Sequence, residues 1–308
     1  MKESLFEERF ETASELIGEW SDYYVYINGV FLKGRQASFS AWDHGLLYGD
    51  GVFEGIRAYQ GKLFKLDEHL ERLYDSAHSI GISEVPLSPE EMRQAIVEAL
   101  RLNQLKDAHI KPVITRGIGT MGHDPRKATH PSVLIYTYSY PSILGGQPVR
   151  LITSSVRRKS PYSVDPRIKT LCYVDNILAK LQANSAGADD ALMLDPNGFV
   201  AEATAANIFS YQDGKLYTPW TTACLPGITR AAVIELARTA GMETVERNMT
   251  VADFYVAEEV FLTGTAAEIV PVTSIDGRNV RHEAPGEVTR KLTQSFWELV
   301  ERESIPYL

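Results

Sequence analysis

Three features of the sequence combine residue types that can do chemistry. Glu202 lies in a segment that is apolar on both sides (FVAEATA), and an unpaired glutamate is seldom buried. Gly227-Ile228-Thr229 opens a helix, whose first amide groups can bind an anion. A lysine such as Lys169 can bind a carbonyl compound and move protons. Each feature has an ordinary alternative: an ion-paired or edge-strand glutamate, a plain turn-to-helix junction, or a solvated surface lysine.

Pyridoxal phosphate (PLP) is a cofactor that would require three such features of a protein. Its aldehyde needs a lysine amine, and its phosphate needs amide N–H groups with a cation. Its pyridine nitrogen needs a carboxylate that keeps it protonated, so that the ring can accept electrons from the substrate. No single motif in the sequence establishes this set.

Two predicted domains carry these residues. The first, residues 1–140, is a small α/β domain, and the second, residues 149–308, is a larger one that contains Lys169. Two prolines and a glycine pair place a linker at 141–148. In the first domain the patterns predict a hairpin at 23–32 around Asn28-Gly29, a strand at 51–60, helices at 67–80 and after the Ser88–Glu91 capping box, and strands at 109–116 and 132–139. In the second they predict strands at 149–155, 260–265 and 269–274, a hairpin at 191–209, and three helices, one that follows Lys169 and ends near Gly187, one from 228 to Gly241 and one at 285–302.

The bulk composition describes a globular protein and excludes several functions. The chain has 308 residues, 44% of them hydrophobic, and a formal net charge of −9. This acidic balance argues against nucleic-acid binding, and no apolar run approaches the roughly 20 residues that span a membrane. The N-terminal segment lacks the features of a signal peptide, and two cysteines make no disulfide framework. We therefore expect a cytoplasmic location. No His, Cys or carboxylate spacing predicts a metal site.

Six blocks, in order, resemble the class IV (fold type IV) aminotransferases, the family of branched-chain and D-amino-acid aminotransferases. They are YGDGVFEGIRAY (48–59), HLERLYDSA (69–77), KTLCYVDNILAK (169–180), DDALMLDPNGFVAEATAANIF (189–209), LPGITR (225–230) and GTAAEIVPV (264–272). The resemblance implies a two-domain α/β protein with mixed sheets and flanking helices. It also implies PLP as cofactor and a homodimer or higher homo-oligomer in which a partner subunit completes the pocket.

The resemblance assigns roles to residues that bind the cofactor. Lys169 would be the Schiff-base lysine and the proton shuttle, and Glu202 would face the pyridine nitrogen. Arg72 would bind the phosphate together with the helix start at Ile228 and Thr229 and the hydroxyl of Thr265. Tyr173 would bond the phenolic oxygen of PLP, and Leu225 would pack on its ring.

On the substrate side, the residues resemble the branched-chain enzymes more than the D-amino-acid enzymes. Alternation along a strand puts Phe53, Gly55 and Arg57 on one face, beside Tyr48. Thr265 and Ala266 would hold the substrate carboxylate. His109 and Lys111 stand where the family carries Tyr-x-Arg, and lysine lacks the bidentate fork of arginine. The loop with Met121 and His123 would reach a neighbouring subunit, and Cys172 replaces a more usual asparagine.

The expected reaction is ping-pong transamination between a branched-chain L-amino acid and a 2-oxo acid such as 2-oxoglutarate, both of them small-molecule partners. Three alternatives stay open. One is a D-amino-acid or (R)-amine transaminase of the same fold, and another is an aminodeoxychorismate lyase. The third is a PLP-binding module that has no catalytic role.

Overall fold

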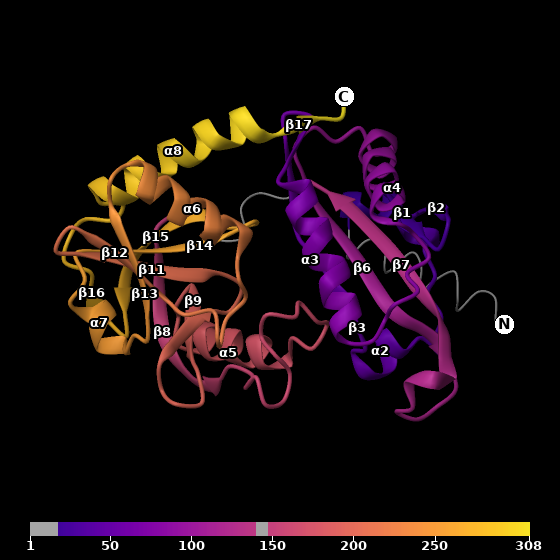
Figure 1. Cartoon of the computed structure of the whole chain (residues 1–308), viewed down its shortest axis with the longest axis horizontal. Coiled ribbons are helices and arrows are strands. Elements are labelled where there is room, and N and C mark those ends of the chain that lie inside the picture. The colour runs from indigo at the N-terminus through magenta and orange to yellow at the C-terminus, as the bar shows by residue number, and fades with distance from the viewer. Residues whose placement is uncertain (1–17, 140–146) are drawn as a thin grey trace. The chain divides into compact units, whose positions relative to one another are not determined.

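The computed structural model describes residues 18–139 and 147–308, and the chain divides into two compact units (Figure 1). One unit contains residues 1–140 with 304–308, and the other contains residues 141–303. Most of the predicted linker at 141–148 lies outside the described residues. Residues 304–308, which the sequence assigned to the C-terminal domain, join the first unit because Ile305 pairs with Leu63 and Tyr307 Oη donates to Leu105 O.

The first unit is built on one sheet in which every described pairing is antiparallel. The strand order is β17-β5-β4-β6-β7-β1-β2, and β3 also pairs with β6. The predicted hairpin is confirmed: Asn28 and Gly29 both have positive φ, which the tight turn between paired Ile27 and Val30 requires. The strands are β1 (Tyr24–Ile27), β2 (Val30–Lys33), β3 (Gly51–Phe53), β4 (Ile56–Tyr59), β5 (Lys62–Phe64), β6 (Ala108–Gly119), β7 (Ala128–Tyr138) and β17 (Ile305–Pro306).

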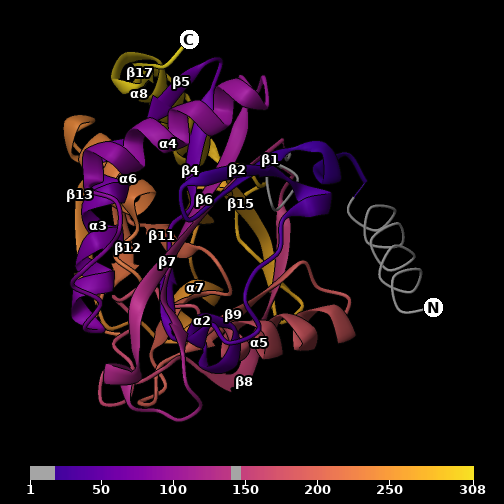
Figure 2. The same cartoon turned by 90° about the vertical axis from the view of Figure 1, so that its right-hand side faces the viewer.

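Two long helices cover this sheet, α3 (Leu66–Ser79) and α4 (Pro89–Leu102) (Figure 2). Helix α4 begins at the predicted capping box, in which Ser88 and Glu91 satisfy each other's backbone N–H groups. Short elements complete the unit: α2 (His44–Tyr48), η1 (Gly18–Asp22), η2 (Gly34–Gln36) and η3 (Pro125–Lys127).

The single strand predicted at 51–60 was wrong, because the structure has two strands separated at Glu54-Gly55. The register nevertheless continues along β6: Phe53 lies opposite Val113 and Arg57 opposite His109. Gly55 therefore falls opposite Lys111. Phe53 and Arg57 keep the common face that the sequence predicted, and the side chain of Glu54 is buried at the break.

The second unit contains a sheet that mixes parallel and antiparallel pairs, in the order β10-β9-β8-β15-β14-β11-β12-β13, with β16 on β15. Its strands are β8 (Val149–Arg157), β9 (Asp190–Leu194), β10 (Val200–Ala203), β11 (Asn207–Gln212), β12 (Lys215–Pro219), β13 (Glu243–Arg247), β14 (Glu259–Gly264), β15 (Glu268–Ile275) and β16 (Arg278–Asn279). Its helices are α5 (Val174–Ser185), α6 (Ile228–Thr239), α7 (Val251–Tyr255) and α8 (Glu287–Glu303). The core lies between strands and helices and includes Leu192, Ile208, Phe254 and Val270.

The hairpin predicted at 191–209 is confirmed only in part. Strands β9 and β10 pair around the Pro-Asn-Gly turn, but the chain turns again, where Ala203 N donates to Ala206 O. Residues from Asn207 onward form β11, which pairs with β12 and β14 instead. This second turn brings Glu202 and Asn207 to the same edge of the unit.

None of the helices in residues 18–139 and 147–308 is both long and apolar enough to cross a membrane.

Candidate functional site

In the second unit, Lys169, Tyr173 and Leu225 line one small pocket together with Arg158 and Thr170. Lys169 lies in the loop after β8, and Tyr173 is the residue from which α5 starts. The structure therefore brings together three of the residues predicted to bind the cofactor. Cys172 lies in the same turn, where its backbone N–H donates to Thr170 Oγ1.

Glu202 is buried at the edge of this group, and both carboxylate oxygens have partners. Oε1 lies 2.7 Å from Arg158 Nη2, and Oε2 accepts from Leu225 N at 3.3 Å. Burial raises the pKa of Glu202, while Arg158, the Leu225 N–H and Lys169 act in the opposite direction. The position therefore holds a carboxylate whose charge depends on its cationic neighbours.

Arg158 is a residue that the sequence interpretation missed. Its guanidinium is buried and also donates to Asp175 Oδ2 at 3.1 Å and to Asn176 Oδ1 at 3.0 Å. Asn176 in turn donates to Thr204 O at 2.7 Å, which ties α5 to the turn after β10. The charge of Arg158 is thus divided between two carboxylates, Glu202 and Asp175.

Asn207, also missed, ties Glu202 to the start of α6. Its Nδ2 donates to Leu225 O at 2.9 Å and lies 3.4 Å from Glu202 Oε2. Gly227 is required next to it, since an added Cβ would come within 2.1 Å of Asn207 Oδ1. No side chain caps the helix at Gly227, so the first N–H groups of α6, at Ile228 and Thr229, are available as anion donors.

The turn between β14 and β15 contains Thr265 and Ala266, two further predicted residues. It lies at the same edge, because Asn207 pairs with Thr263 and Gly264 approaches Ala205 O. Within the described residues, the buried Thr263 Oγ1 has no hydrogen-bond partner. This edge therefore combines hydroxyl groups with the helix start that the sequence assigned to a phosphate.

The first unit presents two cations on the face shared by β4 and β6. Arg57 Nη1 donates to His109 Nε2 at 2.5 Å, and Lys111 Nζ lies 4.8 Å from the Phe53 ring centroid. Burial, and then the charge of Arg57, lower the pKa of His109 to about 4. His109 is therefore neutral near pH 7, as an acceptor of the Arg57 hydrogen bond must be.

Tyr48 and Met121 lie together in the first unit. Tyr48 Oη lies 3.6 Å from Met121 Sδ and accepts from Gly122 N at 2.9 Å, and His123 packs on the Tyr48 ring. One turn earlier on α2, the buried His44 bonds Thr120 O at 3.0 Å. Helix α2 thus holds the loop in which the sequence placed substrate contacts.

Arg72, the predicted phosphate ligand, lies on α3 and is bound by Glu54. Arg72 Nε donates to Glu54 Oε1 at 2.6 Å and Nη2 donates to Oε2 at 3.0 Å. Glu54 and its second partner, His69, had no predicted role. The rule that singled out Glu202, a glutamate among apolar residues, would also have found Glu54 in GVFEGI.

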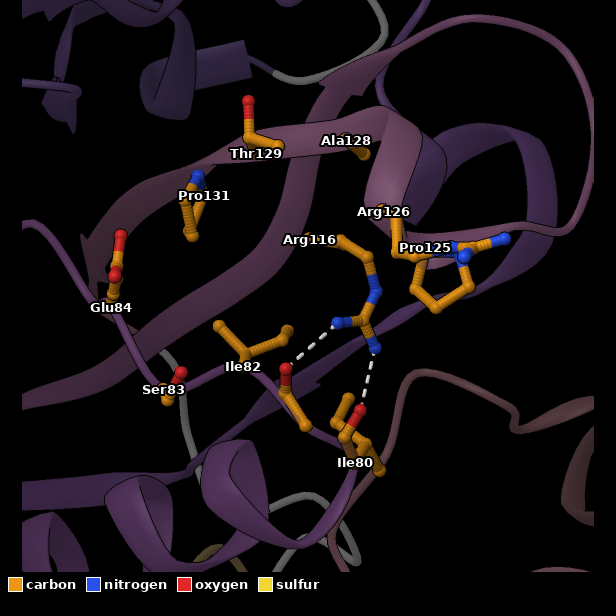
Figure 3. Close-up of a pocket in the computed structure, with 11 residues that line it drawn as sticks. Ile80, Ile82, Ser83, Glu84, Arg116, Pro125, Arg126, Ala128, Thr129 and Pro131 are labelled. Carbon is orange, nitrogen blue, oxygen red and sulfur yellow. Dashed lines mark hydrogen bonds between the residues drawn. The ribbon is translucent and has the colours of Figure 1, made fainter.

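A separate pocket in the first unit surrounds Arg116 (Figure 3). None of the predicted site residues lines it. Arg116 donates to Ile80 O, Gly81 O and both oxygens of Asp50, so its charge and most of its donors are used within the protein. In the part of the chain that the structure describes, no cluster of His, Cys, Asp and Glu has a metal-binding arrangement.

Comparison with known proteins gives consistent matches over most of the chain. A family model for class IV amino-transferases matches residues 51–275. A putative branched-chain-amino-acid aminotransferase of Methanocaldococcus jannaschii is 50% identical, covering 88% of this chain and 94% of that protein. The branched-chain-amino-acid aminotransferase of Pseudomonas aeruginosa is 39% identical, covering 91% and 93%. The solved branched-chain amino acid aminotransferase of Thermobaculum terrenum, in its PLP form, matches with a TM-score of 0.83 and 32% identity, over 92% of this chain and 95% of that one. These likenesses confirm the predicted fold class.

Proposed function

We propose, from the premise that this chain belongs to the PLP-dependent class IV aminotransferases, that it transfers the amino group of a branched-chain L-amino acid to a 2-oxo acid such as 2-oxoglutarate. The observation that carries the proposal is the group formed by Lys169, Tyr173, Leu225 and the buried Glu202 in the second unit. The names of the relatives and the apolar and cationic side chains of the first unit support the substrate class.

The residues present fit PLP, which when bound supplies an electron sink for the bonds at the substrate's α-carbon. Glu202 is a buried carboxylate suited to a protonated ring nitrogen. The uncapped start of α6 at Ile228 and Thr229, with Thr265, suits a phosphate, and Arg72 is the cation that we assign to the same group. Tyr173 would hold the phenolic oxygen, and Leu225 would pack on the ring.

Three residues of the second unit then have distinct tasks. The Lys169 amine would move a proton away from the donor's α-carbon in the first half-reaction and a proton onto the acceptor's α-carbon in the second, and its own protonation state would be restored within each. Arg158 offsets part of the cost of burying the charge of Glu202, whose pKa burial still raises. Asn207 fixes Leu225 and the helix start relative to that carboxylate.

Substrate binding is assigned to the first unit and to the turn at 264–267. Thr265 and Ala266 would meet the α-carboxylate. Phe53 and Gly55 leave an apolar space for a branched side chain, and Arg57 and Lys111 provide charge for the distal carboxylate of the acceptor. Tyr48 and Met121 would border the same space, and His109 would act through Arg57.

We also propose a cytoplasmic homodimer or higher homo-oligomer. The supporting observation is an apolar stripe on α5: Val174, Ile177, Leu178 and Leu181 follow helical spacing and are each between 46% and 67% exposed. A stripe of this kind on a helix that starts at Tyr173 is typical of a protein–protein interface.

The proposal is tested by single half-reactions of the holoenzyme with L-leucine, D-alanine and an (R)-amine. We expect L-leucine alone to shift the visible absorbance of the cofactor quickly and to yield its 2-oxo acid. A response to D-alanine or the (R)-amine without a response to L-leucine would overturn the substrate class. Release of pyruvate from aminodeoxychorismate would identify a lyase. Unchanged turnover in Lys169→Ala would overturn the role of this lysine.

A further inference from the structure

Glu54 is the carboxylate that binds Arg72, the residue assigned to the phosphate of the cofactor. Its side chain is fully buried, and its oxygens accept from Arg72 Nε, Arg72 Nη2, His69 Nδ1 and Gly55 N at 2.6, 3.0, 2.8 and 3.2 Å. Its backbone N–H donates to Pro112 O on β6. The strand break at Glu54-Gly55 therefore holds one carboxylate in one orientation.

These bonds exclude Glu54 as a proton-transfer group. The charge of Arg72, together with the hydrogen bonds from His69 and Arg72, outweighs burial and lowers the pKa of Glu54 far below its usual range. A carboxylate whose oxygens are all engaged by the protein, and which does not protonate near neutral pH, has no capacity to exchange a proton with a substrate. Its effect must be exerted on the groups that it binds.

The contact of Glu54 with Arg72 fixes the orientation of the guanidinium. Glu54 occupies the Nε–Nη2 edge of the planar guanidinium, which restricts rotation about the end of the side chain. This edge of Arg72 is therefore occupied by Glu54 when a second anion binds. His69 lies one helical turn before Arg72 on α3 and bonds the same carboxylate, so it steadies the pair.

We propose that Glu54, steadied by His69, is a positioning residue that fixes the direction from which Arg72 meets the phosphate group of the cofactor. The inference rests on the role proposed above for Arg72. It gives the glutamate of the VFEGIR segment a task in cofactor retention that is separate from substrate binding.

The opposite effect is also physically reasonable, which makes the proposal testable. A carboxylate within 3 Å of Arg72 offsets part of its positive charge. If charge alone mattered, removing the negative charge of Glu54 would strengthen the attraction of Arg72 for a phosphate. If orientation matters more, removing the carboxylate would weaken that attraction, and moving it by one methylene would do the same.

The experiment measures the release of PLP from holoenzyme on dilution, in buffer with and without inorganic phosphate, for Glu54→Gln, Glu54→Asp and Arg72→Lys. We expect both Glu54 variants to lose PLP about tenfold faster than the parent, because residues that orient a binding group typically contribute about that factor. Added inorganic phosphate should speed the release of PLP more in the two variants than in the parent. The ³¹P signal of bound PLP should change in both. Slower release in Glu54→Gln with unchanged release in Glu54→Asp would overturn the proposal in favour of charge alone.

Asp50→Asn is the matched control, since it removes another carboxylate from a buried arginine of the same unit, Arg116 (Figure 3). We expect it to lower thermal stability without changing PLP release. Equal PLP loss in Asp50→Asn would assign the effect to general destabilisation and overturn the inference. If Arg72→Lys also keeps PLP as well as the parent, the assignment of Arg72 to the phosphate fails, whereas transaminase activity can still be intact.

Discussion

Two buried glutamates, one in each unit, are paired with arginines, and their pKa values are shifted in opposite directions. Glu54 receives two hydrogen bonds from Arg72 and one from His69, and its pKa is lowered. Glu202 faces Arg158, which is shared with Asp175, and its pKa is raised. Burial acts in the same direction on both, so the number and allocation of donors determine the sign.

The difference separates an anchor from a reactive group. Glu54 is stabilised as an anion and serves to hold other side chains. Glu202 is buried with incomplete compensation, and such a carboxylate gains the most from a cationic partner such as a protonated ring nitrogen. We expect a residue that binds an incoming group to have a buried charge with too few partners before the group binds. A residue that only orients other side chains should have all of its hydrogen bonds made within the protein.

The largest effect that we expect from this contrast is on activity. Glu202→Gln removes the charge that would face the ring nitrogen, so the L-leucine half-reaction should slow by about 10²- to 10³-fold, as when a charge-stabilising group is lost. Stopped-flow absorbance of the holoenzyme, corrected for bound cofactor, measures this rate. A loss below threefold would show that Glu202 does not serve the ring.

The second effect is on the free energy of unfolding. Here we expect Glu54→Gln to lose more than Glu202→Gln. Glu54→Gln leaves Arg72 and His69 without their buried anion, and its free energy of unfolding should fall by about 3–5 kcal/mol. In Glu202→Gln, Arg158 keeps Asp175 and Asn176, so the change should be about 1 kcal/mol. Urea unfolding followed by circular dichroism compares the two variants.

The third effect is on acid stability, where we expect Glu54→Gln and the parent to differ. Because the folded-state pKa of Glu54 lies below its unfolded value of about 4.3, its contribution to stability is present above that pH and is lost as the pH falls below it. Glu54→Gln should therefore lose less stability than the parent between about pH 4.3 and pH 3. Identical acid sensitivity in the two proteins would contradict the lowered pKa.

The sequence predicted local structure better than it predicted these pairs. Asn28-Gly29 and the Ser88–Glu91 box were readable because their geometry depends on neighbouring residues. Arg158 was not, since its partners Asp175 and Asn176 lie 17 and 18 positions away and meet it only after α5 folds onto β8. The second turn before Asn207 was missed because the apolar pattern of 199–209 continues through it.

The fourth prediction tests how Arg158 affects Glu202. Arg158→Met removes the cation that offsets the burial of Glu202, so the pKa of Glu202 should rise further and less of the enzyme should hold the ionised carboxylate. The acid limb of the half-reaction rate should move to higher pH by about one unit or more. Lys159→Met is the control, since Lys159 lines the same pocket and bonds Asp175 but is not one of the main causes of the pKa shift of Glu202. An unmoved acid limb in Arg158→Met would remove the proposed link.

The smallest expected effect concerns a third arginine, Arg57, whose described partner His109 is neutral. This contact contains no carboxylate, unlike those of Arg72 with Glu54 and of Arg158 with Glu202, and we propose that Arg57 meets a substrate carboxylate. His109→Gln retains a hydrogen-bond acceptor, so the KM for 2-oxoglutarate should change by only about two- to threefold. His109→Lys places a second cation against Arg57 and should alter the KM for this dicarboxylate more than the KM for L-leucine. Because the pKa of His109 is about 4, the parent's KM for 2-oxoglutarate should be constant from pH 6 to 8. An inflection in this range that disappears in His109→Gln would show that His109 becomes charged in the working enzyme.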